Sequence, residues 1–540
     1  MRASGLWEAL ELARRANLRT SGEPAPVPGE TGRTRREVII ALAAAASAAT
    51  LPRDAHAAAA PAKKPPVPPI KNAPGAPAKA GPVAIVGGGL AGLTALWTLT
   101  HAGVDARLYE ARARLGGRMY TARLPGGDLA DMGGQLVNTD HHDMAELART
   151  FGVGLIDRKG GRHRSVIFDG AQPVAEADAV EALRPLAAQM THDADRLDRD
   201  YAGVAAELDR MSFTSYLDKH CSKLPQRWVR GLLETTARTE YGVEPGQASA
   251  IELMFNLPSI EGARVEVLSR SDERYLIAGG SSALVEAMAA RVSKRIVTGK
   301  RVTAINPAPG GGARLLFAAG AHVDAAAVIV ATPASITRKI DFGVALPALW
   351  KRFLLEANLG RNEKVQARMR ARAWEPVCGR GGELWRTEAG AVASGWDGGV
   401  RPHAGAGVGG AWTWFLGGDE VARAAEGDAL VQARAFAASV EAGVPGMTAA
   451  TLAAHRTGWH RDPMSMGGYV NYRPGQMTRF ARLFWVEERG RASPPVASGV
   501  VHFAGEHLSD AYPGYMNGAA QTGRLAAEAV VAQLAAAKAA

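Results

Sequence analysis

Three glycines near residue 87 have the spacing of a loop that binds phosphate through its backbone. Gly87, Gly89 and Gly92 follow the apolar run VAIV and fit the pattern G-x-G-x-x-G. Leu90 and Ala91 open the helical pattern that comes next. In such a loop the first glycine permits a tight turn, the second lets the backbone approach a pyrophosphate, and the third lets the helix pack on the strand. The N-terminus of the helix then offers N–H groups and the positive end of its dipole to the phosphates.

An acidic residue stands where a dinucleotide-binding unit needs one. The segment DARLYEA predicts a second strand that ends at Glu110 and Ala111, and Glu110 lies 18 residues after Gly92. A carboxylate at that place beyond the glycines bonds the ribose hydroxyls of a dinucleotide. Strand, loop, helix, strand and acid together predict a dinucleotide site, but they do not choose between NAD and FAD.

The residues that follow Glu110 favour FAD. The stretch EARARLGGRMYTA contains Arg112, the pair Gly116–Gly117 and Arg118. It resembles the segment after the second strand in the flavin amine oxidase family, where an arginine and a Gly-Gly-Arg turn contact the FAD pyrophosphate. The resemblance implies this contact for Arg112, Gly117 and Arg118. Arginine suits the role because its planar fork carries a permanent charge.

A second glycine pair resembles another flavin-contacting element of that family. In ADMGGQLVN the residues Gly133, Gly134, Gln135 and Leu136 follow one another, and the family's glycine pair passes close to the flavin. Some members that oxidise amino acids place an arginine just after the pair, where this chain reads GGQLVNTDHH. We therefore expect an amine without an α-carboxylate, although an arginine from the middle of the chain could serve a carboxylate.

Two segments in the second half of the chain also match the family. GKRVTAI predicts a strand whose Val302 occupies the place of a valine on the adenine side of FAD. LGRNEKVQARM predicts a strand in which Lys364 stands where the family has a lysine that holds a water against flavin N5. A cation there would favour electron-rich flavin and help an oxidant approach. Without the family resemblance, the two residues would be a core valine and an exposed lysine on an edge strand.

The stretch WHRDPMSMGGYVNYRPG bears on how the cofactor is held. It resembles the monoamine oxidase segment in which a tryptophan is followed nine residues later by a covalently flavinylated cysteine and then by a tyrosine. Trp459 and Tyr469 match, whereas Gly468 stands at the cysteine position. No thiol is available there, so the resemblance implies FAD that is bound noncovalently.

The last matching segment predicts a strand, a turn and a helix. VVHFAGEH reads as a buried strand that ends at Gly505 and Glu506, beside the flavin's ribityl and phosphate groups in the family. The small residues of DAYPGYMNGAAQTG would let the final helix, which includes Met516, approach the flavin ring. The positive end of the helix dipole would stabilise an anionic reduced flavin.

Two tyrosines from separate segments would face the flavin. Tyr515 matches the family tyrosine that stands perpendicular to the ring, and with Tyr469 it would form two walls of an aromatic cage. Such a cage attracts an amine by cation–π contact and orients its reacting bond. Core packing is the alternative for both rings. We expect Tyr512 to line the cavity entrance and assign it no firm role.

The matching segments, from Pro82 to about Val531, imply an FAD-dependent amine oxidase with Lys364, Tyr469 and Tyr515 as catalytic residues. A neutral amine would give up a hydride equivalent, and water would hydrolyse the resulting imine. Electrons would pass to O2, giving H2O2, or to a periplasmic acceptor. An L-amino-acid oxidase, a desaturase or protoporphyrinogen-oxidase-like flavoprotein, and a noncatalytic flavin-binding protein stay open as alternatives. The tyrosines disfavour the desaturase, which needs no amine cage.

The first 80 residues read as a leader. Arg35 and Arg36 precede an apolar run of about a dozen residues, too short to span a bilayer, and then the small-residue stretch DAHAAAA. This resembles a twin-arginine export signal with cleavage near Ala57, which would carry a folded, cofactor-loaded protein to the periplasm or beyond. A disordered tail with a chance arginine pair is the alternative. Residues 58–80 read as a semi-rigid Pro/Ala linker.

Composition excludes several other functions. The net charge is +10, of which residues 1–80 carry +6, so the rest is only mildly basic and nucleic acid is not expected as a partner. We expect no metal site, no stable membrane anchor, and solvated side chains for His141 and His142. Pairing of the two cysteines, Cys221 and Cys378, and a homodimer are left open.

The elements that must position these residues are those of an α/β protein with two domains. We expect a Rossmann-like FAD-binding domain and a substrate domain with a mixed sheet and a helical insertion, for which a purely structural bundle is the alternative reading. The expected parts are residues 1–57 (signal), 58–80 (linker), 81–145, 273–340 and 456–540 (FAD-binding domain), and 146–272 and 341–455 (substrate domain).

Overall fold

The computed structural model describes residues 82–539 except 126, 162, 256–257, 262–263, 268–270, 310, 389–391, 393, 401–408, 489–490 and 493–495. The expected export signal, with Arg35 and Arg36, and the linker lie outside the described residues. Within the described part of the chain, no helix is both long enough and apolar enough to cross a membrane.

A six-stranded sheet brings together strands that are far apart in the sequence. In spatial order its strands are β12 (Ile296–Val297), β2 (Ala106–Tyr109), β1 (Val83–Val86), β16 (Val328–Val330), β28 (Val501–Phe503) and β27 (Ala497–Ser498). All neighbours are parallel except β27 and β28. The loops that follow β1, β2, β16 and β28 therefore meet at one edge, where doubly wound sheets bind ligands.

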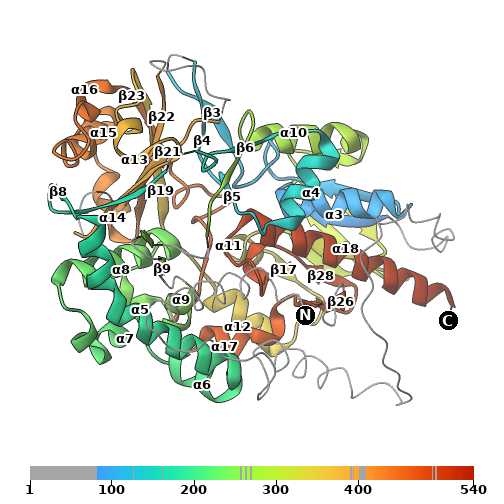
Figure 1. Ribbon diagram of the computed structural model, residues 1–540. Helices are drawn as coiled ribbons and strands as arrows, with labels where there is room; N and C mark the ends of the chain where they lie inside the picture. Colours follow the sequence, from blue (N-terminus) through green and yellow to red (C-terminus); the bar gives the residue numbers. More distant parts are fainter. Residues whose placement is uncertain are drawn as a thin grey trace, which may run out of the picture.

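Two helices pack side by side on this sheet because glycines let them approach (Figure 1). Helix α3 (Leu90–His101) follows β1, and helix α18 (Met516–Ala539) ends the chain. A Cβ at Gly523 of α18 would lie 2.2 Å from the carbonyl oxygen of Ala91. A Cβ at Gly92 would lie 1.9 Å from the carbonyl oxygen of Gly87, so the third glycine of the motif lets α3 pack against its own loop and β1.

A seven-stranded sheet forms the second large layer of the molecule. Its strands are, in order, β23 (Thr451–Arg456), β19 (Asn362–Met369), β22 (Gly410–Gly417), β21 (Ser394–Asp397), β20 (Glu383–Arg386), β7 (Ser165–Asp169) and β8 (Gln172–Pro173). Strand β19 is paired on both sides and almost wholly buried. Lys364 therefore lies on an interior strand, which excludes the exposed edge-strand lysine of the alternative reading.

The middle of the chain is helical, as the spacing of its apolar residues predicts. Its helices are α5 (Glu176–Arg199), α6 (Tyr201–Asp209), α7 (Phe213–Lys219), α8 (Arg227–Tyr241) and α9 (Ala250–Phe255). Helix α8 packs on β22, where a Cβ at Gly417 would lie 1.5 Å from the carbonyl oxygen of Arg238. The C-terminal end of α8 thereby approaches the large mixed sheet.

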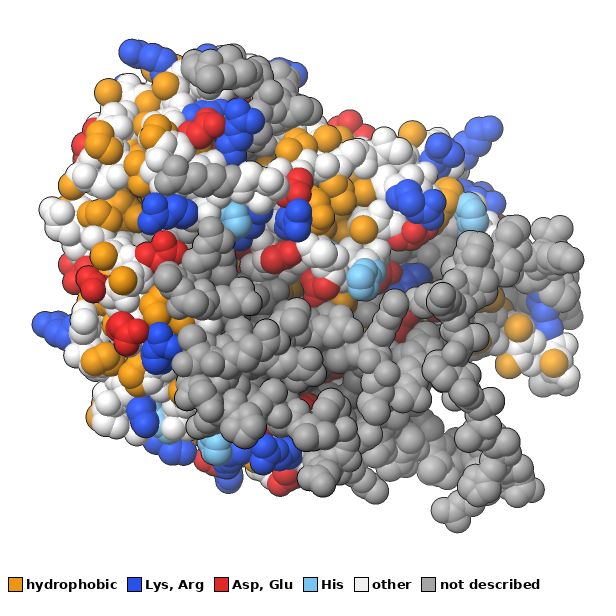
Figure 2. Space-filling model, in the orientation of Figure 1, with side chains coloured by type: hydrophobic (Ala, Val, Ile, Leu, Met, Phe, Trp, Pro, Cys, Tyr) orange, Lys and Arg blue, Asp and Glu red, His pale blue; other side chains and the backbone are white. Residues whose placement is uncertain are grey.

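Smaller elements complete the fold. One sheet consists, in order, of β15 (His322–Ala325), β14 (Ala313–Phe317), β13 (Val302–Pro307) and β17 (Asp341–Phe342). Another consists of β5 (Leu136–Val137), β11 (Tyr275–Ile277) and β6 (Leu155–Asp157). Acidic and basic side chains are interspersed on the described surface that Figure 2 shows.

Candidate active site

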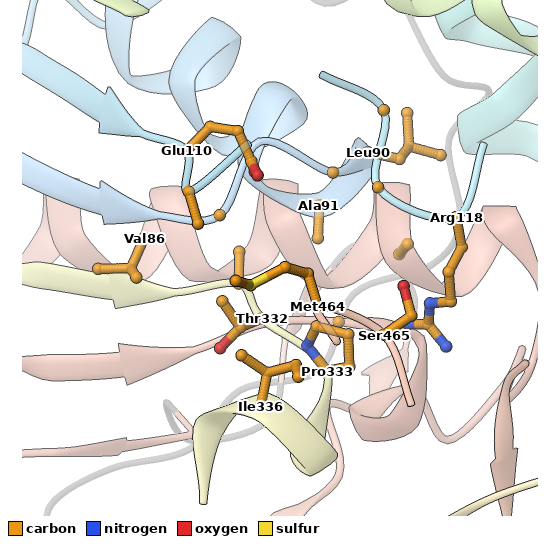
Figure 3. Close-up of a pocket in the computed structure, with 18 of the residues that line it drawn as sticks. Val86, Leu90, Ala91, Glu110, Arg118, Thr332, Pro333, Ile336, Met464 and Ser465 are labelled. Carbon is orange, nitrogen blue, oxygen red and sulfur yellow. The ribbon is translucent and has the colours of Figure 1, made fainter. Parts of the chain in front are cut away.

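A cavity of about 430 Å³ lies at the edge of the parallel sheet where its strands end. Figure 3 shows Leu90 and Ala91 from the start of α3, Glu110 after β2, and Thr332 after β16 around it. Met464 and Ser465, from the segment that carries Trp459 and Tyr469, close another side. The cavity thus joins the first glycine motif to segments several hundred residues away.

The glycine loop leaves space and free donors at this cavity. A Cβ built on Gly89 would meet only the Cα of Gly117, at 4.0 Å, and both residues line the cavity. Gly89 caps α3 without a side-chain hydrogen bond, and the first turn of the helix holds no acidic residue. The N-terminal N–H groups and the dipole of α3 are therefore available to an anion, which fits the pyrophosphate of a dinucleotide.

Glu110 both lines this cavity and braces the loop. Its Oε2 accepts a hydrogen bond from the Gly88 N–H at 2.7 Å, and its Oε1 accepts one from the Arg112 N–H at 2.8 Å. These bonds fix the carboxylate at the end of β2, as a group that receives ribose hydroxyls must be fixed. Val302 also lines the cavity, whereas Gly92 lies behind the loop.

The two arginines predicted to contact the pyrophosphate line the cavity but are held by carboxylates. Arg112 forms an ion pair with Asp462, and its Nη2 donates to Ser465 Oγ at 3.2 Å. Arg118 Nη1 lies 2.8 Å from Glu506 Oε1. Their guanidinium groups therefore join the early cofactor segment to the late one, a role that the sequence motif did not reveal.

Lys364 is anchored beneath the second glycine pair. Its Nζ donates to the carbonyl oxygen of Gly133 at 2.7 Å, to Gln135 Oε1 at 2.8 Å and to the carbonyl oxygen of Asp131 at 3.3 Å. The residue is only 6% exposed, and burial lowers the pKa of Lys364 to about 8. Lys364, Gly133, Gln135 and Leu136 all line a second cavity.

This second cavity, of about 210 Å³, has aromatic walls. Its aromatic lining residues are Tyr241, Trp385, Trp396, Phe415, Trp459, Tyr469 and Tyr515. The Trp459 Nε1 donates to the carbonyl oxygen of Met132 at 2.7 Å, and the Trp396 Nε1 donates to Gln135 Oε1 at 3.3 Å. These bonds fix two indoles against the glycine-pair segment, so the walls are rigid.

Tyr469 and Tyr515 line both cavities and mark where the two cavities adjoin. The Tyr469 hydroxyl donates to the carbonyl oxygen of Thr239 on α8. A Cβ at Gly514, whose φ is +85°, would lie 3.4 Å from Tyr469 Cδ2, so the turn before Tyr515 passes against the first ring. Gly134 and Met516 also line both cavities.

His141 is buried rather than solvated, which corrects the expectation for it. It is 1% exposed, and its ring lies 5.0 Å from the Tyr515 ring and 5.5 Å from the Tyr512 ring. Its Nδ1 accepts a hydrogen bond from the Asn138 N–H, and burial lowers the pKa of His141 to about 3. His142 is exposed, as expected.

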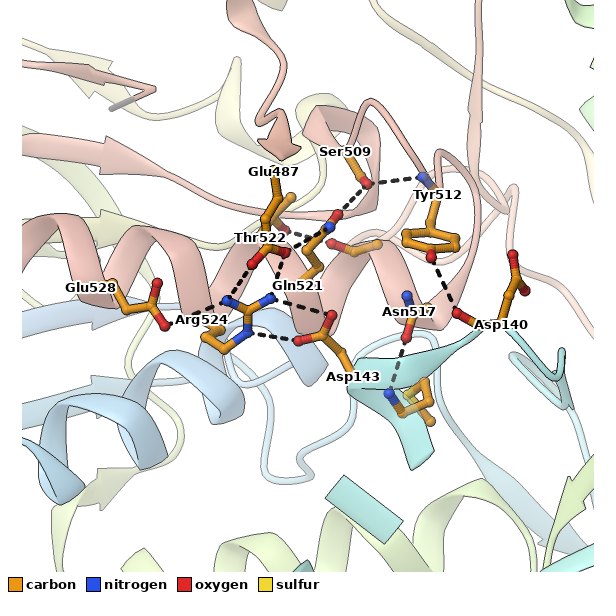
Figure 4. A network of polar contacts seen from close by, with 12 residues as sticks. Asp140, Asp143, Glu487, Ser509, Tyr512, Asn517, Gln521, Thr522, Arg524 and Glu528 are labelled. Carbon is orange, nitrogen blue, oxygen red and sulfur yellow. Dashed lines mark hydrogen bonds and ion pairs between the residues drawn. The ribbon is translucent and has the colours of Figure 1, made fainter. Parts of the chain in front are cut away.

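The turn before α18 is fixed by a polar network (Figure 4). Ser509 Oγ accepts from the Tyr512 N–H at 3.0 Å, and the Tyr512 hydroxyl donates to the carbonyl oxygen of Asp140 at 3.1 Å. On the next turns, Arg524 pairs with Asp143 at 2.7 Å and with Glu487 at 2.8 Å. Tyr512 is thus a buried anchor, not a residue at the cavity entrance.

Four carboxyl groups of the second cavity were not predicted from sequence. Glu240 lies in the last turn of α8, Glu252 lies in α9, Glu273 precedes β11, and Glu383 begins β20. Burial and neighbouring carboxylates raise the pKa values of Glu240 and Glu273. Burial alone would raise the pKa of Glu383, but Lys159 and Arg158 bring it below its ordinary value. No local signal marks these residues, because each comes from a different element.

The two cysteines are separate in this structure. Cys221 is exposed and Cys378 is buried, and both are free thiols. Burial raises the pKa of the Cys378 thiol to about 12. The pairing that the sequence left open is therefore absent between these two described residues.

A family comparison decides the class of the protein. The family described as flavin containing amine oxidoreductase matches residues 90–531. The chain belongs to this family. It is therefore a flavin-dependent oxidoreductase that acts on amines, and the α/β fold with a Rossmann-like cofactor domain is the fold of its structural neighbours.

The chain also aligns with bacterial relatives over nearly the whole length of those proteins. The (S)-6-hydroxynicotine oxidase of Paenarthrobacter nicotinovorans is 27% identical over 467 residues, which cover 83% of this chain and 98% of that protein. The L-amino acid dehydrogenase of a Synechocystis strain is 24% identical over 475 residues, which cover 83% and 94%.

Solved structures of amine oxidoreductases share the fold. Putrescine oxidase bound to putrescine has a TM-score of 0.70 at 21% identity, covering 84% of this chain and 99% of that one. Cyclohexylamine oxidase from Brevibacterium oxydans has a TM-score of 0.68 at 23% identity, with the same coverage. At these identities the likeness concerns the fold alone.

Proposed function

We propose that this flavin amine oxidoreductase binds FAD noncovalently and oxidises the C–N bond of a small amine that lacks an α-carboxylate. The observation that carries the proposal is the position of Tyr469 and Tyr515, which line both the glycine-loop cavity and the aromatic cavity. An amine between the rings would lie next to the ring end of a dinucleotide whose phosphates meet α3. FAD, when bound, supplies a hydride acceptor at N5.

The residues of the aromatic cavity would bind and orient the amine. The π faces of Tyr469 and Tyr515 attract the cationic form of the amine. They also keep the neutral amine in the orientation in which its reacting bond faces the cofactor. Bonds to Thr239 and the packing of His141 keep the rings in place. Lys364 keeps a positive charge beside the glycine pair, and the indoles of Trp396 and Trp459 exclude water from the reacting bond.

The charges of the aromatic cavity support an amine over an amino acid. Glu240, Glu252, Glu273 and Glu383 line it, and none of these carboxyl groups can neutralise a substrate carboxylate. Its lining cations, Arg118 and Lys364, are engaged by Glu506 and by the carbonyl and amide oxygens described above. The sequence GGQLVNTDHH, without an arginine after the glycine pair, supports the same conclusion.

Noncovalent attachment rests on Gly468, which lines both cavities at the place where monoamine oxidases carry the flavinylated cysteine. Acid precipitation tests it directly. All flavin absorbance is expected in the supernatant, and a yellow pellet would contradict the proposal.

Flavin absorbance followed without oxygen tests the reaction. Primary monoamines, diamines and polyamines, cyclic secondary amines and L-amino acids are added in turn to the purified holoenzyme. Bleaching by an amine class that air reverses supports an amine oxidase, and bleaching that air reverses slowly supports a dehydrogenase with another electron acceptor. Bleaching by amino acids alone would overturn the argument from the cavity charges, and no bleaching by any of them would reject amine oxidation.

We also propose export through the twin-arginine pathway, which would place the enzyme in the periplasm or outside the cell. The support is Arg35–Arg36 before a short apolar run and DAHAAAA. Cell fractionation of the wild type and of a variant with both arginines replaced by lysine tests this. Export that persists in the double variant would count against the proposal.

A further inference from the structure

The aromatic cavity holds more carboxyl groups than the reaction of a monoamine requires. Its lining includes Glu240, Glu252, Glu273 and Glu383, and Glu252 accepts a hydrogen bond from the Tyr472 N–H. Arg158 and Lys159 each lie 3.2 Å from Glu383 Oε1, so this carboxylate has its own cations. Glu240 and Glu273 are less well supplied with partners.

Glu240 has no cation among the described residues. Its hydrogen-bonding neighbour is Thr239, which is neutral, and its charged neighbours are Glu273 and Glu383. Glu273 lies 3.9 Å from Arg158, which is already bound to Glu383 at 3.2 Å. Burial and the neighbouring carboxylates therefore raise the pKa of Glu240, and a cation that enters the cavity would stabilise its ionised form.

A further acceptor lies in the same wall. Asn362 lines the cavity and is 3% exposed; its Nδ2 donates to the carbonyl oxygen of Thr239 at 2.7 Å. Its buried Oδ1 has no hydrogen-bond partner within the described part of the chain. Asn362 is thus bonded to Thr239, the residue before Glu240, and its unpartnered amide oxygen suits an N–H donor.

The reacting nitrogen does not satisfy these acceptors. It must lose its proton before its lone pair can assist oxidation, so it carries no charge in the reacting complex. Only a cation that keeps its charge in the reacting complex can therefore stabilise the ionised forms of Glu240 and Glu273. We propose, on the basis of the proposed amine oxidation, that the substrate carries a second cationic group, as in an aliphatic diamine, and that Glu240 with Glu273 binds that group. The volume of about 210 Å³ limits the substrate to a small molecule, because pockets for drug-sized ligands have volumes of about 300–1,000 Å³.

Matched substrate pairs test the proposal on the wild-type holoenzyme. Anaerobic flavin reduction is measured with putrescine against n-butylamine and with cadaverine against n-pentylamine, at one pH. We expect kcat/KM to be about 30-fold higher for each diamine, which is the usual effect of a well-desolvated charge pair. Equal values for diamine and monoamine would overturn the second cation but leave amine oxidation intact. Failure of every amine to reduce the flavin would instead reject the proposed function, and the inference with it.

Two variants assign the effect to Glu240. Glu240→Gln keeps the shape and removes the charge, and we expect it to narrow the diamine preference about tenfold or more. The control Glu286→Gln removes the same charge from an exposed position on α10 (Ser281–Val292) and should keep the wild-type preference. If Glu240→Gln lowers kcat/KM equally for diamine and monoamine, Glu240 acts on the reacting amine and the proposed second site is wrong. If Glu240→Gln loses flavin, the diamine preference is measured in Glu273→Gln instead, and the wild-type substrate pairs still test for the second cation.

Discussion

Glu506 and Arg118 form an ion pair that joins the two tyrosine-bearing segments to the first cofactor segment. Glu506 Oε1 lies 2.8 Å from Arg118 Nη1, and the same arginine nitrogen donates to the carbonyl oxygen of Gly468. Glu506 Oε2 accepts from the Gly514 N–H at 2.9 Å and from the Val470 N–H at 3.4 Å. The bonds therefore flank Tyr469 on both sides and hold the residue before Tyr515.

Removing the charge of Glu506 should weaken both the fold and the cage. We expect Glu506→Gln to lower the free energy of unfolding by about 2–3 kcal/mol, because a charged hydrogen-bonding partner is lost at a buried carboxylate. Flavin reduction by the amine substrate should slow about tenfold or more, since the rings lose their alignment. Urea unfolding of the holoenzyme and stopped-flow absorbance measure the two effects.

Asp128→Asn is the control for this prediction. It breaks the Arg368–Asp128 pair, which is 2.9 Å long and whose side chains are 34% and 42% exposed. An exposed pair contributes about 0–1 kcal/mol. If both variants lose the same stability and activity, the Glu506 pair has no special part in the cage.

The local motifs could be predicted because backbone geometry demands their residue types. The glycine loop, its helix and Glu110 form one continuous unit, and their roles follow from spacing alone. Lys364, Tyr469 and Tyr515 were found through the family resemblance, and the structure brings all of them to the adjoining cavities.

Long-range polar contacts could not be predicted in this way. Arg118 and Glu506 are 388 residues apart, and neither residue type shows which partner it will meet. Glu240 looks like an ordinary solvated carboxylate at a helix end, and His141 like an ordinary polar residue. Their burial depends on how α8 and α18 pack on other elements, which single-sequence patterns do not encode.

Because the two cysteines are separate, we expect one reactive thiol in the native protein and two in the denatured protein. Cys221 is exposed, whereas Cys378 is buried and its thiol has a pKa raised to about 12. A thiol reagent should therefore modify Cys221 in the native protein and both residues after denaturation under non-reducing conditions. Peptide mass analysis identifies the modified sites. Failure to label either one after denaturation would indicate a disulfide and contradict the structure.

Burial of neutral His141 predicts a dependence of stability on pH. Its pKa falls from 6.5 to about 3, so below about pH 6.5 the unfolded state binds a proton that the folded state does not. The free energy of unfolding should therefore decrease as the pH falls from 6.5 toward 3. His141→Phe should make this decrease shallower, whereas His142→Phe at the exposed neighbour should not. Identical pH slopes in denaturant titrations of the wild type and His141→Phe would show that His141 is not buried as a neutral ring.

Lys364 should govern how fast the reduced enzyme reacts with its oxidant. Burial lowers the pKa of Lys364 to about 8, so its positive charge is complete well below this pH and is lost as the pH rises through it. A fixed cation that favours developing negative charge contributes about a hundredfold in rate. We therefore expect reoxidation by O2 in the wild type to slow as the pH rises through about 8. Lys364→Met should be about a hundredfold slower at low pH and nearly independent of pH.

Stopped-flow mixing of the reduced holoenzyme with O2 measures this rate. Lys364→Arg, which keeps a charge that does not titrate, should flatten the pH profile while retaining part of the rate. Lys351→Met, at an exposed position on α12 (Ala348–Glu356), is the control and should match the wild type. If Lys364→Met reoxidises at the wild-type rate but loses stability, the bonds of Lys364 to Gly133 and Gln135 serve the fold alone, because the oxidant would then not respond to the charge.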